Sequence, residues 1–199
     1  MKKKFIGVLY PMKCVLLTNR IERGTSMKGE KPNNIVFGRG IFKLDGVAVG
    51  LTRDGGTFKV EYNNRLITAD GDRGPVKGRI HREEAKASIS FSHLEILTSF
   101  KDLHSGLAET TDGEYTVVRG TGKITDADYH EVVFVGETKD GREVEISIED
   151  AINLENIDFT MKDKDDILDN VVFQATYDPT NETLDEFDER WAIKYKTAK

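Results

Sequence analysis

Cysteine is almost absent from this sequence of 199 residues, and its absence removes two kinds of structure. Cys14 is the only cysteine, so the chain can form no internal disulfide and no cysteine-based zinc site. Nothing in the composition therefore requires an oxidising compartment.

Long hydrophobic runs are also missing. Residues 5–10 follow three lysines and imitate the start of a signal peptide, but Pro11 and Lys13 interrupt the run and no small-residue cleavage site follows. The run is far shorter than the roughly 20 residues that a membrane-spanning helix needs. The sequence therefore predicts no membrane partner.

The first residues allow two interpretations. In one, translation starts at Met27 and residues 1–26 do not belong to the protein. In the other, these residues form an N-terminal arm that adds contacts to a neighbour. The predicted organisation is accordingly an N-terminal arm over residues 1–32 and a β domain over residues 33–199.

An excess of basic residues is missing as well. The formal net charge is −6, which argues against a dedicated nucleic-acid binder because such a protein needs a basic face. The same charge is compatible with a surface past which DNA slides without adhering. A hydrophobic content of 38% is enough for a real core.

Recognisable catalytic and metal-binding motifs are absent too. The sequence contains no Gly-x-Ser-x-Gly and no phosphate-binding Gly-Lys-Ser/Thr, and residues 163–166 lack the glycine and glutamate of a calcium loop. We predict no enzyme, no cofactor and no metal site. The four histidines have no paired spacing, which indicates surface or lightly packed side chains: His81, His93, His104 and His130.

Alternating apolar and polar residues dominate what is present. Several such segments are separated by glycine-rich turns, among them Asp45-Gly46, a strong hairpin signal. Spacings of three and four from Leu97 to Leu107 predict one short amphipathic helix. The tail from Thr183 fits either a helix or, over residues 191–195, a strand. The predicted fold is mainly β, an antiparallel sandwich or barrel of about ten strands with one flanking helix.

The sequence between two of these segments predicts a long projecting β-hairpin. Residues 57–63 and 87–92 each alternate as half-buried strands do. The stretch between them is too polar to continue a strand and too varied for a Gly/Ser linker. Its glycines allow close backbone approach and its charges can pair across an interface. The predicted contact loop is Asp70, Gly71, Asp72, Arg73, Gly74, Pro75, Val76, Lys77, Gly78 and Arg79.

Three segments resemble the major tail tube proteins of long-tailed bacteriophages. They are residues 65–79, residues 41–53, and a hairpin predicted over residues 157–178 with charged residues at its tip. Their order and spacing extend the resemblance over about residues 33–195, but residues 1–26 match nothing in that family.

The resemblance implies a structural subunit. Such proteins assemble as hexameric rings that stack into a hollow tube, through which DNA leaves the capsid. The implied partners are further copies of the chain, the tail-tip, tail-terminator and tape-measure proteins, and the transiting DNA. The implied location is the virion tail, assembled in the host bacterial cytoplasm. Tubes of contractile and of non-contractile tails both fit.

Acidic side chains facing the lumen would repel DNA phosphates. One face of a predicted strand offers Glu143, Glu145 and Glu149 for this role. An ordinary solvated face explains each of these residues equally well. The alternative function is a monomeric β-sandwich module that binds a carbohydrate or protein ligand. That function predicts clustered exposed aromatic residues, whereas the sequence has a single tryptophan and no aromatic residue in the 69–79 loop.

Overall fold

The computed structural model describes residues 36–161, 163–177 and 190–197, which all belong to the unit Pro32–Lys199. They form a mainly β structure with antiparallel pairing and one short α-helix, as predicted. The strands are β1 (Val36–Leu44), β2 (Val47–Ala48), β3 (Thr52–Leu66), β4 (Ile80–His93), β5 (Leu107–Asp112), β6 (Tyr115–Gly120), β7 (His130–Thr138), β8 (Glu143–Asn153), β9 (Asp169–Ala175) and β10 (Trp191–Tyr195). The helix is α1 (Ile96–Leu103), and a 3-10 turn, η1, covers Asp126–Asp128.

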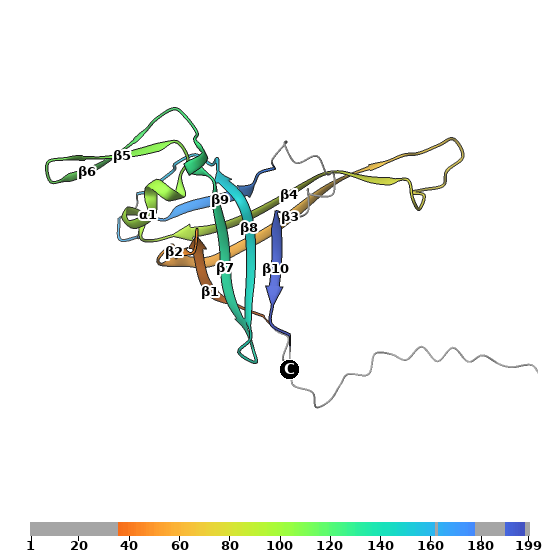
Figure 1. Cartoon of the computed structure of the whole chain (residues 1–199), viewed down its shortest axis with the longest axis horizontal. Coiled ribbons are helices and arrows are strands. Elements are labelled where there is room, and N and C mark those ends of the chain that lie inside the picture. Colours follow the sequence, from red (N-terminus) through yellow and green to blue (C-terminus); the bar gives the residue numbers. More distant parts are fainter. Residues whose placement is uncertain (1–35, 162, 178–189, 198–199) are drawn as a thin grey trace, which may run out of the picture. The chain divides into compact units, whose positions relative to one another are not determined.

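The larger sheet has the order β2-β1-β7-β8-β9-β4-β3, with β10 as an additional partner of β8 (Figure 1). Strands β5 and β6 form a separate two-stranded sheet. The arrangement is sandwich-like, and the described strands do not close into a barrel. Of the two predicted architectures, the described residues therefore agree with the sandwich, in the form of an open, sandwich-like sheet.

Strand β8 changes partner along its length. Its first half pairs with β10, over Val144–Ile148, and its last three residues pair with β9. Asp150 lies between the two halves with a positive φ of 46°, and its carboxylate accepts hydrogen bonds from Arg190. Because β7 occupies the opposite edge throughout, β9 and β10 diverge from one edge of β8, and this gives the sheet its two layers.

The predicted turn at Asp45-Gly46 is confirmed. Leu44 pairs with Val47 across it, and the two turn residues have φ values of 49° and 83°. Positive φ at both positions is what a type I′ turn requires. The turn residue Asp45 also accepts hydrogen bonds from the Glu131 amide and His130.

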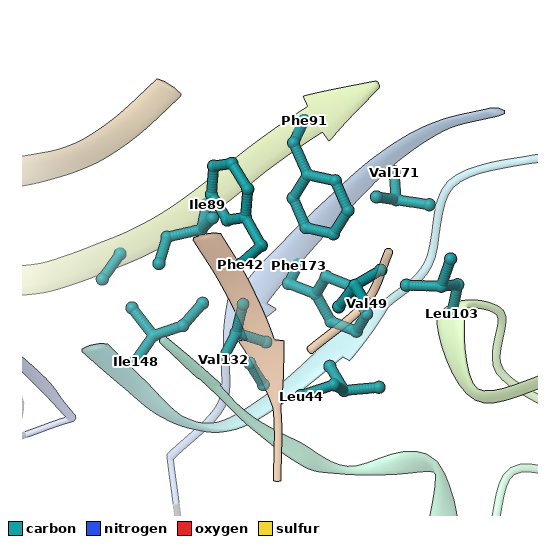
Figure 2. Packing of buried hydrophobic residues seen from close by; sticks show 12 residues of the cluster. Phe42, Leu44, Val49, Ile89, Phe91, Leu103, Val132, Ile148, Val171 and Phe173 are labelled. Atoms are coloured by element: carbon teal, nitrogen blue, oxygen red, sulfur yellow. The ribbon is translucent and has the colours of Figure 1, made fainter. Parts of the chain in front are cut away.

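The core lies where side chains of the two layers meet (Figure 2). The rings of Phe42 and Phe91 stack with centroids 4.5 Å apart, and Phe42 also contacts Phe134 at 5.0 Å. Gly56 faces the Phe42 ring so closely that a Cβ there would lie 2.4 Å from it. This glycine therefore lets β3 approach β1. Fully buried members of the core include Ile89, Leu103, Val132, Ile148, Val171 and Phe173.

The predicted helix exists, but its orientation differs from the prediction. Helix α1 ends at Leu103, and Leu107 belongs to β5. Leu103 is buried, whereas Leu97 is 97% exposed. The spacing rule placed both on one core-facing side. The spacing rule fails because the helix has only eight residues and lies at the end of the sheet, where other elements cover only part of one side of it.

The hairpin predicted over residues 157–178 is wrong in its first half. Residues 154–161 form no strand, and only β9 forms in this region. A segment of alternating apolar and polar residues forms a strand only where it can pair with the edge of a sheet. Here Phe159 packs instead against Phe100 of α1, with ring centroids 5.6 Å apart. At the other end of the chain, β10 confirms the strand prediction for residues 191–195, and Thr183 lies outside the described residues.

Candidate assembly interface

The β3–β4 hairpin is the predicted arm, and it is longer than predicted. Thirteen residue pairs run from Thr52–His93 to Leu66–Ile80, whereas β9 accompanies β4 only from Ser88 to His93. Residues 61–86, which we call the distal arm, therefore have no other described strand beside them. Figure 1 shows the distal arm extending away from the rest of the sheet.

One face of the distal arm continues the core-facing side of the hairpin. Phe58 and Val60 of β3 pack against the core, and the same face then presents Tyr62 and Leu66. Opposite them on β4 lie Ala85 and, after a register shift at Asn63–Asn64, Arg82 and Ile80. Tyr62, Leu66 and Ile80 are 39%, 49% and 50% exposed. The apolar face thus extends beyond the part of the chain that covers it.

The opposite face of the arm is charged and internally paired. The Lys59 ammonium lies 2.6 Å from the Glu61 carboxylate, and the corresponding distance from Lys86 to Glu84 is 3.0 Å. The hydrogen bond from Lys59 lowers the pKa of Glu61, which therefore stays ionised. This face is a solvated one, so the arm is amphipathic along its whole length.

The tip loop is ordered by Asp72. Its Oδ2 accepts hydrogen bonds from the Ala69 amide at 2.7 Å and from Arg79 Nη1 at 3.0 Å. Backbone hydrogen bonds from Ile67 N to Arg79 O and from Arg79 N to Val76 O close the base. The positive φ of Gly71, Gly74 and Gly78 permits these turns. Hydrogen bonds therefore hold the loop in a defined conformation.

The predicted contact residues separate into two groups. Asp72 and Arg79, which we expected to pair across an interface, pair with each other inside the loop. Arg73 and Lys77 are exposed and have no ion-pair partner among the described residues. Residues 65–82 contain five Arg or Lys and two Asp, a net charge of +3 in a chain whose total is −6. The tip is therefore basic on an acidic protein.

The three predicted lumen residues occupy β8 as expected but differ in surroundings. Glu143 and Glu149 are exposed and Glu145 is half-buried. Glu143 forms an ion pair with Lys196 at 3.1 Å, so its charge is compensated. Ser147, between them, is buried, and it pairs with Val133 of β7 on one side and with Ala192 of β10 on the other.

The prediction for the histidines is wrong for two of them. His93 and His104 are 0% and 4% exposed. His104 Nε2 lies 2.9 and 3.0 Å from the two carboxylate oxygens of Asp169, and Asn153 Nδ2 lies 3.3 Å from His104 Nδ1. The cluster joins α1 to β8 and β9. The signal in the sequence that could have revealed this cluster is a polar residue at the end of an apolar strand, as at Asn153 and Asp169.

The described residues contain no group of three or more His, Cys, Asp or Glu side chains that could hold a metal ion. None of their helices is long and apolar enough to cross a membrane. No protein-family model matches the chain, and no curated protein sequence matches it.

Proposed function

We propose that this protein is a structural subunit that assembles into stacked, hexameric rings and so forms the hollow tail tube of a long-tailed bacteriophage. The observation that carries the proposal is the distal arm, which has a partly exposed apolar face and a basic, ordered tip. A hairpin of two strands alone is marginally stable in water. A neighbouring subunit supplies the contacts that such an arm lacks.

Unpaired strand edges support the same proposal. Among the described residues, β3 pairs only with β4, and β10 pairs only with β8. Exposed edges favour pairing with other chains. In a closed ring of identical subunits, each edge is completed by a neighbour, which removes this liability.

The proposal also includes the surroundings of the tube. DNA passes through an acidic lumen to which Glu145 and Glu149 contribute, because like charges prevent phosphates from adhering. The partners are the tail-tip, tail-terminator and tape-measure proteins. The subunit works in the virion tail after assembly in the host bacterial cytoplasm, and it catalyses no reaction.

Negative-stain electron microscopy across a concentration series tests the proposal. The full chain is compared with a variant in which a short Gly-Ser link replaces residues 70–78. A matched control is Glu114→Ser, which changes an exposed turn residue of the β5–β6 hairpin. We expect rings or hollow tubes from the full chain and from the control, and none from the loop variant.

Other results have distinct meanings. Tubes that persist without residues 70–78 would keep the function and contradict the role of the arm tip. A chain that stays monomeric even when mixed with tail-tip assemblies would contradict the tube. The monomeric ligand-binding module would then be the better function.

A further inference from the structure

A cleft lies between the β1–β2 hairpin and α1. It has a volume of about 290 Å³, and its apolar lining comes from Leu44, Val47 and Val49. Its polar lining residues are Asp45, Ser99, Asp102 and His130. No role has been assigned to this cleft so far.

The surface around the cleft exposes large apolar side chains. Val47 is 71% exposed and Leu51 63%. Leu51 belongs to this surface because its backbone is hydrogen-bonded to Leu94 and to the Glu95 side chain, immediately before α1. Exposed apolar residues that gather in one place mark interaction surfaces more often than scattered ones do.

One carboxylate at the cleft has no partner among the described residues. Asp45 is hydrogen-bonded to His130, and Glu95 to the Leu51 amide. Asp102 of α1 is exposed and forms no ion pair or hydrogen bond with any described residue. The cleft therefore combines an apolar floor, an apolar surround and an acidic group that is available to a cation.

The arm tip has the complementary properties. Leu66, Ile67 and Ile80 are about half exposed, at 49%, 47% and 50%. Beside them, Arg73 and Lys77 are the cations without described partners. The tip is basic and the cleft acidic, so the two surfaces match in charge as well as in apolar character.

We propose that the β2–α1 cleft receives the arm tip of a second copy of this chain, with Lys77 or Arg73 paired to Asp102. This inference rests on the assembly proposed above and names the acceptor surface for the arm. Apolar residues of the tip cover Val47 and Leu51, and the ion pair sets the register of the contact.

The distance along β3 excludes the chain's own arm as the occupant. Strand β3 begins at Thr52, immediately after the cleft residues, and runs for 15 residues toward the tip. At about 3.3 Å per residue, the tip lies about 50 Å from the cleft. Figure 1 shows α1 and β2 at one end of this hairpin and the tip at the other. The contact therefore joins two copies, and repeated head-to-tail it generates rings or filaments.

Charge reversal tests the contact in the full chain. One variant carries Arg73→Glu with Lys77→Glu, a second carries Asp102→Lys, and a third carries all three changes. The control is Glu114→Lys, an exposed charge on the β5–β6 turn. Sedimentation velocity measures the protein concentration at which assembly begins. We expect about a tenfold increase for each of the first two variants, corresponding to the loss of one register-setting ion pair, and recovery in the third.

Mixing the first two variants gives a second and sharper readout. The Asp102→Lys chain keeps a normal arm, and the Arg73→Glu/Lys77→Glu chain keeps a normal cleft. The normal arm then matches the normal cleft and the reversed arm matches the reversed cleft, so a head-to-tail contact predicts that the two variants assemble together, in alternation, at a concentration where each variant alone is monomeric. This measurement applies whether or not the unaltered chain forms tubes on its own.

The outcomes separate the two proposals. A mixture that stays monomeric, or reversals that leave assembly unchanged, would overturn the cleft as acceptor. If the unaltered chain still forms tubes in that case, the proposed function stands. If neither the mixture nor the unaltered chain associates, even in the presence of tail-tip assemblies, both proposals are overturned.

Discussion

At the scale of single residues, His104 and Asp169 hold the end of the helix against the sheet. Their side chains are each 2% exposed. Asn153 Nδ2 donates to the Leu103 carbonyl at 2.7 Å and approaches His104 Nδ1 at 3.3 Å. Nδ1 therefore acts as acceptor and Nε2 carries the proton that it donates to Asp169. No buried side-chain nitrogen or oxygen of this contact lacks a hydrogen-bond partner, since the Glu155 amide donates to the remaining Asn153 oxygen.

Removing the imidazole leaves the Asp169 carboxylate buried without its partner. We expect His104→Ala to lower the free energy of unfolding by about 3–5 kcal/mol. Asp169→Asn keeps an acceptor for Nε2 and is expected to cost about 1–3 kcal/mol. Urea denaturation followed by fluorescence measures both, and the exposed His81→Ala is the control. An effect of His104→Ala equal to that of the control would contradict the structural role.

At the scale of elements, the β5–β6 hairpin depends on the loop that follows it. The Asp128 carboxylate accepts hydrogen bonds from the Gly106 amide at 2.7 Å, the Thr125 amide at 2.6 Å and the Thr125 hydroxyl at 2.9 Å. Partial burial raises the pKa of Asp128, but the hydrogen bonds from Gly106 and Thr125 outweigh it, so the pKa lies below its ordinary value. Asp128 thereby fastens η1 to the base of the hairpin.

This contact is predicted to be pH-dependent. Because the folded pKa is lowered, Asp128 stabilises the protein fully above its unfolded pKa of about 3.9, and this stability is lost as the pH falls through the folded value. We expect Asp128→Asn to cost about 1 kcal/mol at pH 7, with faster hydrogen exchange of the Gly106 amide. The difference from the unaltered chain disappears toward pH 2. A difference that grows on acidification would contradict this assignment.

At the scale of the whole molecule, the distribution of charge predicts that the proposed assembly is sensitive to salt. In the proposed assembly, the basic tip of one copy attracts the acidic remainder of another, and the Debye length falls from about 10 Å at 0.1 M salt to about 3 Å at 1 M. We expect the concentration at which assembly begins to rise between these two salt concentrations. Light scattering measures it, and the Arg73→Glu/Lys77→Glu chain, which lacks the attraction, serves as the control with a much weaker salt response.

Sequence reasoning predicted the fold class and the arm because both depend on neighbouring residues. The type I′ turn at Asp45-Gly46 follows from the positive φ that these two residues tolerate. Residues 57–63 and 87–92 alternate strongly enough to predict the hairpin, and the glycines of the tip predict its loop. The exposed cations Arg73 and Lys77 were part of that prediction, whereas the cleft at Asp102 was not.

The sequence by itself determines the hydrophobic period of each segment and the residues of each turn, because both are set within a few neighbouring positions. Tertiary structure alone decided which side chains are covered. It buried His104, left Leu97 exposed, kept residues 157–161 out of the sheet and gave β8 two successive partners. Burial depends on elements distant in the sequence that pack together, and a local pattern carries no record of which elements those are.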